Sequence, residues 1–177
     1  MITGPSGVGK GTLIQRLLER VPALELAVSA TTRSPRQGEH DGQHYHFLSE
    51  GDFLRRVEEG DFLEHAEYSG RRYGTLRSEL RKRTQAGASV VLEIEVQGAR
   101  QVAQEMPEAV RILIAPPSEA TLRERLIGRG TDDPAQIERR LQVAKDELAA
   151  RPEFPHVVVN DDLERAVEQL EAIVSGG

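Results

Sequence analysis

The stretch that decides the fold class is GPSGVGKGT at residues 4–12, that is Gly4, Pro5, Ser6, Gly7, Val8, Gly9, Lys10, Gly11 and Thr12. It has the G-x-x-x-x-G-K spacing of a Walker A motif. Glycines in such a loop let backbone N–H groups converge on one phosphate, and the lysine adds a point charge. Apolar residues at helical spacing follow from Leu13 to Val21. The stretch therefore predicts a phosphate-binding loop at the start of a helix that packs on a sheet.

Two features depart from the usual form of this motif. The Ser or Thr that binds magnesium directly after the lysine is replaced by Gly11, and a hydroxyl arrives one residue later at Thr12. Nucleotide binding is still expected, whereas a direct threonine–magnesium contact is in doubt. Only Met1, Ile2 and Thr3 precede the loop, so the buried strand expected there is short. This suggests a trimmed start, or a natural N-terminus further upstream.

Composition limits the class of protein. The chain has 177 residues, which suits one compact domain with small inserted lobes. A net charge of −6 with 29% charged residues argues against a nucleic acid partner, which would require a basic face. The absence of cysteine excludes disulfides and thiolate metal sites, and no apolar run is long enough to span a membrane. The expected location is the cytoplasm.

The segment 29–75 holds two groups of polar residues. Arg33 and Arg36 lie in a loop punctuated by proline and glycine, where both can bend toward one anion; the alternative is a pair of solvated arginines. Residues 62–75 place a carboxylate, two tyrosines and a hydroxyl in a strand–turn segment, which suits a small polar ligand or an ordinary surface. His44 and His46 alternate with Tyr45 along an expected strand, so they are not interpreted as metal ligands.

Further along the chain, strands alternate with helices. An apolar strand is expected over Leu24–Ala30, and Thr75 is expected to cap a helix that ends near Gly87. Val90–Val96 is typical of a buried parallel strand, and its acids Glu93 and Glu95 lie on one face at the carboxyl end, where such sheets bind ligands. The pattern predicts an α/β fold with a parallel sheet flanked by helices.

Residues 118–146 are expected to form two short helices joined by a turn. Asp133 and Gln136 have the spacing of a capping box, with Pro134 at the first helical position. Five arginines lie on these helices: Arg123, Arg125, Arg129, Arg139 and Arg140. A mobile lid could bring such cations onto a phosphoryl group, and the alternative is a solvated helical face.

Taken together, the motifs closely resemble the guanylate kinases, which transfer the terminal phosphoryl of ATP to GMP. The resemblance covers nearly the whole chain. Its markers are GPSGVGKGT at 4–12, SATTRSPRQGE at 29–39, the segment 42–47, FLEHAEYSGRRYGT at 62–75, VVLEIEVQGAR at 90–100, RLIGRGTDD at 125–133 and VVVNDD at 157–162.

The resemblance implies a role for each group of residues. The GMP phosphate would be held by Arg33, Arg36, Tyr45 and Tyr73, and guanine would be surrounded by Ser29, Glu64, Thr75 and Glu95. Lys10, Arg125, Arg129 and Arg140 would act on the transferring phosphoryl, and Asn160 would lie by adenine. ATP is the implied donor, with Mg²⁺ held mainly by phosphates and water and Glu93 as a possible outer partner. No protein metal ligand is assigned.

The resemblance also implies a domain plan: a core of residues 1–28, 76–117 and 147–177, a GMP-binding lobe at 29–75 and a helical lid at 118–146. Two positions depart from the pattern, namely Gly11 and Glu95, where many relatives have Asp. Two rival functions are a protein-binding scaffold domain of the same fold, which typically loses the P-loop, and a kinase for another nucleoside monophosphate. The partners expected are the small molecules GMP and ATP, with the oligomeric state undetermined.

Overall fold

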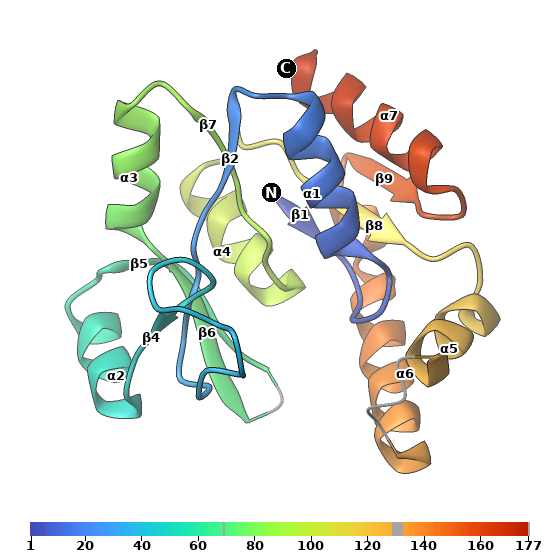
Figure 1. Cartoon of the computed structure of the whole chain (residues 1–177), viewed down its shortest axis with the longest axis horizontal. Coiled ribbons are helices and arrows are strands. Elements are labelled where there is room, and N and C mark those ends of the chain that lie inside the picture. Colours follow the sequence, from blue (N-terminus) through green and yellow to red (C-terminus); the bar gives the residue numbers. More distant parts are fainter. Residues whose placement is uncertain (69, 129–132, 177) are drawn as a thin grey trace. The chain divides into compact units, whose positions relative to one another are not determined.

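A computed structural model of the chain describes residues 1–68, 70–128 and 133–176. These residues group into two compact units, Met1–Pro22 with Val110–Gly177 and Ala23–Ala109. In Figure 1 the first unit is coloured blue and yellow to red, and the second runs from light blue to yellow-green.

The first unit holds the Walker A stretch. Its elements are β1 (Ile2–Thr3), α1 (Lys10–Arg20), β8 (Ile112–Ala115), α5 (Glu119–Gly128), α6 (Pro134–Ala149), the 3₁₀ helix η1 (Arg151–Glu153), β9 (His156–Val159) and α7 (Leu163–Ser175). The strands form a parallel sheet in the order β1-β8-β9, and α1 packs beside α7 (Figure 1). The predicted parallel sheet flanked by helices is therefore confirmed.

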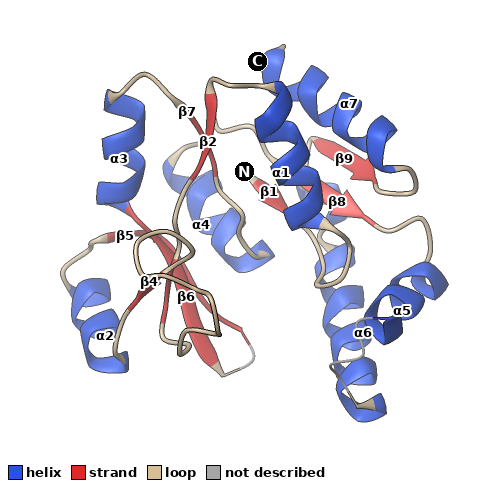
Figure 2. Cartoon of the chain, in the orientation of Figure 1, coloured by secondary structure: helices blue, strands red, loops and turns tan. Residues whose placement is uncertain are grey.

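Helix ends in this unit follow the predicted signals. Asp133 accepts from the Gln136 N–H at 2.8 Å, and the Gln136 side chain accepts from the Asp133 N–H at 2.9 Å, so the capping box is confirmed. Asp162 caps α7 by accepting from the Arg165 N–H at 2.9 Å. In Figure 2 the chain that connects β8 to β9 runs mainly through helices α5 and α6. A buried apolar cluster joins α5 and α6, formed by Leu122, Leu126, Ile137, Leu141 and Ala144.

The second unit carries most of the predicted substrate-binding residues. Its elements are β2 (Leu24–Leu26), β3 (Ala30–Thr31), β4 (His46–Phe47), α2 (Glu50–Glu58), β5 (Phe62–Tyr68), β6 (Arg71–Leu76), α3 (Arg77–Gln85), β7 (Ser89–Val91) and α4 (Val96–Glu105). Strands β2 and β7 pair in parallel, and a second sheet has the order β4-β3-β6-β5. Within it β5 and β6 are antiparallel, and β5 is an edge strand.

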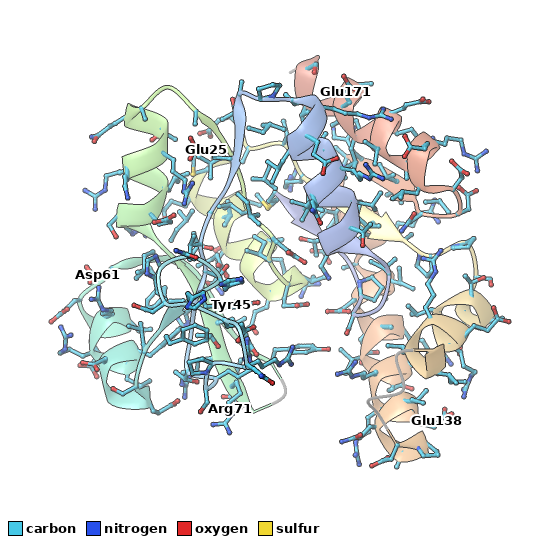
Figure 3. All side chains as sticks on the ribbon, in the orientation of Figure 1. Glu25, Tyr45, Asp61, Arg71, Glu138 and Glu171 are labelled. Carbon is cyan, nitrogen blue, oxygen red and sulfur yellow. The ribbon has the colours of Figure 1, made fainter. Side chains whose placement is uncertain are left out.

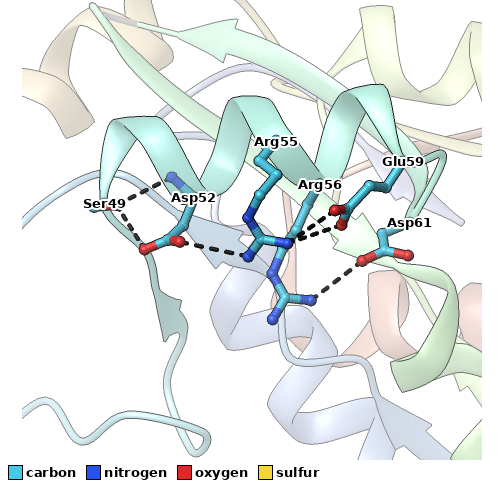
Figure 4. A network of polar contacts seen from close by, with 6 residues as sticks. All are labelled: Ser49, Asp52, Arg55, Arg56, Glu59 and Asp61. Atoms are coloured by element: carbon cyan, nitrogen blue, oxygen red, sulfur yellow. Dashed lines mark hydrogen bonds and ion pairs between the residues drawn. The ribbon is translucent and has the colours of Figure 1, made fainter.

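Helix α2 shows how local chemistry fixes an element in this unit. The Ser49 hydroxyl accepts from the Asp52 N–H at 3.1 Å and so caps the start of the helix. Arg55 then bonds Glu59 one turn later, and the whole exposed network is drawn in Figure 4. On the opposite side Phe53 is fully buried and stacks on Phe62, with ring centroids 4.4 Å apart.

Two predicted elements were wrong in their extent. The run Leu24–Ala30 forms two strands in different sheets, because the Val28 N–H bonds the Glu79 side chain at 3.3 Å and leaves the ladder. The strand expected over Val90–Val96 ends at Val91, and α4 already begins at Val96 with Glu95 as its N-cap. Glu93 and Glu95 therefore lie between a strand and a helix.

Thr75 was expected to cap α3, and this prediction was wrong as well. Leu76 is the N-cap residue, and Thr75 is the fifth residue of β6. Its hydroxyl is engaged elsewhere, since it donates to Glu64 Oε1 at 2.7 Å. In the described part of the chain, no helix is long and apolar enough to cross a membrane.

Candidate functional site

The loop between β1 and α1 has the backbone of a phosphate-binding loop. Gly4 has φ +146°, and a Cβ there would stand 2.3 Å from the Ile114 carbonyl oxygen. Gly9 has φ +99°, and a Cβ there would stand 2.6 Å from Asn160 Nδ2. Any side chain at these positions would force the loop away from β8 and from Asn160. The glycines are therefore required by the close packing of the loop as well as by its turns.

The helix that follows offers donors for an anion. Helix α1 begins at Lys10, and its N-cap Gly9 has a left-handed backbone and makes no side-chain cap. The first turn of a helix leaves N–H groups without intrahelical partners, at the positive end of the helix dipole. Gly11 and Thr12 are exposed on that first turn. The arrangement suits an anion with several oxygens, such as a polyphosphate.

Lys10 folds back over its own loop in this structure. Its ammonium group donates to the Gly4 carbonyl oxygen and lies 3.5 Å from the Pro5 carbonyl oxygen. Both acceptors are uncharged backbone groups, which a phosphate oxygen would outcompete as a partner for the ammonium. The sequence-predicted role of Lys10 is compatible with this geometry and stays a prediction.

Arg125 and Asn160 brace the loop from two other elements of the same unit. Arg125, from α5, donates to the Val8 carbonyl oxygen at 3.1 Å and to the Asn160 carbonyl oxygen at 2.8 Å. The buried Asn160 amide donates to the same Val8 oxygen at 2.8 Å. The structure thus brings Lys10, Arg125 and Asn160 to one loop, and the roles predicted for them stay predictions.

The other predicted lid arginines lie on or between α5 and α6. Arg123 pairs with Glu138 across the two helices, and Glu138 is labelled in Figure 3. Arg140 is half-buried on α6 and has polar or electrostatic contacts of its own. Arg129 lies outside the described residues. The predicted phosphoryl contacts of Arg129 and Arg140 therefore remain predictions.

In the second unit, Glu64 and Thr75 face one another across β5 and β6. Both side chains are buried, at 3% and 0% exposure, and their hydrogen bond is 2.7 Å long. Burial raises the pKa of Glu64 to about 7, against the two hydrogen bonds from Thr75, and the charge of Glu95 raises it further. Thr75 is thus linked to Glu64 by a hydrogen bond, and the charge of Glu95 acts on the same carboxyl group.

Glu95 has one carboxylate oxygen that accepts no hydrogen bond from the described residues. Its Oε2 atom is buried and has no hydrogen-bond partner among the described residues. A buried carboxylate oxygen without a donor is costly, since desolvation is not repaid by a hydrogen bond. Together with Glu64 it forms an acceptor-only surface that calls for a ligand with N–H or O–H donors on one edge.

A cationic and aromatic cluster lies in the same unit. The Arg33 guanidinium lies over the ring of Tyr45, 5.3 Å from its centroid, and over Phe47 at 5.8 Å. The ring of Tyr45, which is labelled in Figure 3, meets Tyr73 edge-on at 6.2 Å. Three of the four residues predicted to hold a phosphate, Arg33, Tyr45 and Tyr73, are thus in one cluster. The fourth, Arg36, has an exposed side chain. Ser29, which was predicted to lie by guanine, accepts from the His46 N–H through its backbone carbonyl.

Sequence reasoning missed one residue in this cluster. Glu39 binds Arg33 in a bidentate pair, with distances of 2.9 and 2.8 Å, and also accepts from the Arg36 N–H at 2.7 Å. The bonds from Arg33 and Arg36 hold the pKa of Glu39 at about 2. A carboxylate thus takes the forked position that suits a phosphate. Its spacing of three and six residues from the two arginines was the available signal.

The described residues fit magnesium only as an ion held mainly by substrate phosphates and water. Among the described residues there is no group of three or more His, Asp or Glu side chains able to hold a metal ion. Mg²⁺ commonly keeps several waters and binds through substrate phosphates with one or two protein ligands. Thr12, an exposed residue on the first turn of α1, is compatible with that mode.

The parallel sheet, the glycine loop and the helix that follows it define a P-loop protein of the nucleotide-binding α/β class. The comparison with protein families then identifies the particular group: the family model for guanylate kinase matches residues 1–176. The chain belongs to the guanylate kinase family. The resemblance seen in the sequence motifs is therefore confirmed.

Individual relatives support the same family assignment. The chain is 53% identical to a guanylate kinase of Synechococcus sp. (strain CC9311) over 171 residues, which cover 97% of this chain and 90% of that protein. A guanylate kinase of Synechocystis sp. is 52% identical over 174 residues, covering 98% and 91%. Among solved structures, a guanylate kinase from Anaplasma phagocytophilum superposes with a TM-score of 0.80 at 33% identity, covering 99% of this chain and 84% of that one.

Proposed function

We propose that this chain is an ATP:GMP phosphotransferase, in which the P-loop binds ATP and the second unit binds GMP. Family membership and relatives named guanylate kinase over nearly the whole chain support this activity. The observation that carries the acceptor choice is the pair of acidic side chains at Glu64 and Glu95, with a buried carboxylate oxygen left without a donor.

Guanine matches these acceptors chemically. One edge of guanine carries the N1–H and N2–H₂ donors, and a carboxylate is the group that can accept from both. Adenine presents an N1 lone pair at the corresponding place, so a carboxylate would face an acceptor. The pair Glu64 and Glu95 thus favours guanine over adenine on hydrogen bonding alone.

The phosphate of GMP is assigned to the cluster of Arg33, Arg36, Tyr45 and Tyr73. Arginine forks suit phosphate oxygens, and a tyrosine hydroxyl can donate to them. Glu39 already satisfies Arg33 in this structure. GMP binding at this cluster would therefore require the phosphate to compete with Glu39 for the guanidinium.

The donor side rests on the P-loop. ATP phosphates would lie against the N–H groups of the loop and α1, with Lys10 bearing on the transferring phosphoryl. Arg125, Arg129 and Arg140 are assigned to the same charge. Mg²⁺ would be held through phosphates and water, where it neutralises charge as the phosphoryl transfers. Adenine is assigned to the neighbourhood of Asn160. We assign residues 29–75 to the GMP-binding lobe and 118–146 to the lid, and the acidic, cysteine-free composition supports a cytoplasmic location.

A coupled assay of GMP, AMP and TMP as acceptors of the ATP phosphoryl, with and without magnesium, tests the proposal. GMP should be turned over far faster than the other two, and only with magnesium present. Faster turnover of AMP or TMP would reassign the acceptor. Absence of turnover with all three, by folded protein, would favour the protein-binding scaffold function.

A further inference from the structure

Glu64 lies on an edge strand, and helix α4 covers that edge. Strand β5 pairs with β6 on one side only. On its other side α4 packs against it (Figure 1). An edge strand presents unpaired N–H and C=O groups along its free side. If Glu64 binds guanine, as proposed above, a residue of α4 must fix the position of the β5 backbone.

Gln101 provides that hold. Its side-chain oxygen accepts from the His65 N–H at 3.1 Å, and its side-chain nitrogen donates to the His65 carbonyl oxygen at 2.6 Å. One amide side chain thus bonds both backbone groups of the residue next to Glu64, as a neighbouring strand would. Because successive residues of a strand direct their peptide groups to opposite sides, the Glu64 backbone is left to pair with β6.

Gly98 lies one turn before Gln101 and faces the same strand. A Cβ at Gly98 would stand 2.2 Å from Glu64 Oε2 and 3.0 Å from its carboxyl carbon. The backbone of Gly98 is not in the left-handed region, since the positive-φ glycines do not include it. Glycine is therefore required here for space and not for backbone conformation, and the space is filled by the carboxylate.

The strand itself is irregular at this point. The register of β5 and β6 shifts between Phe62 and Glu64, so that a bulge precedes the carboxylate. A bulge re-aims the side chains that follow it. Thr75 then fixes Oε1 by its hydrogen bond, while the surface of α4 at Gly98 limits Oε2.

We propose that Gly98 and Gln101 are positioning residues for acceptor specificity, which hold the Glu64 carboxylate in the place where it accepts from guanine. Gln101 fixes the main chain of β5, and Gly98 leaves room for the carboxylate against the helix. Neither residue needs to touch the substrate. The inference rests on the proposed function, since it assigns to Glu64 the reading of guanine.

The sharper test is Gly98→Ala. Alanine has a better helix propensity than glycine, which offsets part of the cost of the clash with the buried carboxylate, so the protein should still fold. The buried Glu64 carboxylate must move, and we expect KM for GMP to rise roughly tenfold to a hundredfold, the range for a lost hydrogen bond to a charged group. Because guanine contacts are the same in the ground and transition states, kcat should change little. KM for ATP should stay within about twofold of the wild type.

A double variant separates displacement of the carboxylate from general damage. Glu64→Asp shortens the side chain by one methylene and moves the carboxylate back from position 98. If Gly98→Ala acts through Glu64, it should raise KM for GMP much less in the Glu64→Asp background than in the wild type. Equal effects in both backgrounds would overturn the role given to Gly98.

Gln101→Ala removes both bonds to His65, and Gln104→Ala is its matched control, an exposed glutamine on the same helix. We expect a raised KM for GMP and a narrowed GMP:AMP preference with the first variant only. Gln101→Glu keeps the acceptor for the His65 N–H but turns a carboxylate oxygen toward the His65 carbonyl oxygen, so it should not recover the loss. A uniform loss of GMP and AMP turnover would mark Gln101 as merely structural, and unchanged KM in Gly98→Ala and Gln101→Ala would overturn the inference.

The same assays distinguish failure of the proposed function from failure of the positioning role alone. If the wild-type protein neither binds GMP by calorimetry nor phosphorylates it, the proposed function fails and the inference fails with it. If the wild type uses GMP and both variants match it, only the positioning role fails.

Discussion

At the scale of single residues, we expect the choice of acceptor to depend on Glu64. It is almost fully buried, accepts from Thr75 and feels the charge of Glu95. A carboxyl group in such surroundings is poised between its two protonation states near neutral pH. Only the ionised form is acceptor-only at both oxygens, and it is the form that guanine requires.

Changing Glu64 should alter the choice of acceptor. We expect Glu64→Ala to lower kcat/KM for GMP by roughly tenfold to over a hundredfold, since hydrogen bonds to charged groups are worth about 1.5–3 kcal/mol. AMP should lose far less. Glu64→Gln offers an amide donor to adenine N1, so it should narrow the GMP:AMP preference further. Equal losses with GMP and AMP for both variants would mean that guanine is read elsewhere.

The raised pKa of Glu64 predicts a pH dependence of GMP binding. Burial raises this pKa from 4.5 to about 7, so at pH 6 most of the free protein carries the protonated acid. GMP requires the carboxylate, and KM for GMP should therefore fall by roughly tenfold between pH 6 and a plateau above pH 7. Glu64→Gln shares the titration of the GMP phosphate but should lack this component. A ratio of the two KM profiles that is flat with pH would contradict the prediction.

The raised pKa of Glu64 also makes the stability of the folded protein depend on pH. The folded state binds the Glu64 proton more tightly than the unfolded state, so its contribution to stability is present below pH 4.5 and is lost as pH rises through about 7.

At the scale of elements, the P-loop and its helix are expected to carry the charge of phosphoryl transfer. Lys10→Ala should lower kcat by about 10²–10³, the usual cost of one preorganised electrostatic contact. Lys82→Ala, on the exposed face of α3, is the matched control and should leave kcat unchanged. Near-normal turnover by a folded Lys10→Ala protein would remove the P-loop lysine from the mechanism.

Helix α2 should depend on one aromatic contact for its docking. Phe53 has no exposed surface and stacks on Phe62, whereas its neighbour Leu54 is 40% exposed. We expect Phe53→Ala to lower the free energy of unfolding by about 3–5 kcal/mol, because it leaves a cavity. Leu54→Ala should stay within about 0.5 kcal/mol of the wild type. Urea denaturation of both variants measures the difference, and similar midpoints would show that α2 is not held by Phe53.

At the scale of the whole molecule, closure around the two nucleotides is the expected motion. Segments 29–75 and 118–146 should move over the core when both nucleotides bind, which excludes water that would hydrolyse ATP. Gly38 and Gly70 have positive φ values and are the expected hinges, together with Gly130, which lies outside the described residues. X-ray scattering and amide exchange, with GMP and a non-hydrolysable ATP analogue, should show compaction and protection of both segments. Identical profiles with and without ligands would contradict closure.

The sequence by itself determined those features that depend on local chemistry. The glycine spacing of residues 4–12 specified a loop before a helix, and the Asp133 and Gln136 spacing specified a helix start, because caps and turns depend on residues a few positions apart. Alternation of strands and helices was enough for an α/β fold. The motifs taken together were enough for the guanylate kinase family, confirmed over residues 1–176.

Only the tertiary structure decided where distant groups meet. Thr75 looked like a helix cap, but a hydroxyl bonds the acceptor that lies nearest in space, and that acceptor is Glu64 on the neighbouring strand. The run Leu24–Ala30 looked like one strand until Glu79, fifty-one residues after Val28, took its N–H. The roles proposed for Gln101 and Gly98 were not predicted from the sequence, because they rest on contacts with the backbone of His65 and the carboxylate of Glu64. Contacts between residues far apart in the chain depend on packing, and packing is not encoded in any short pattern.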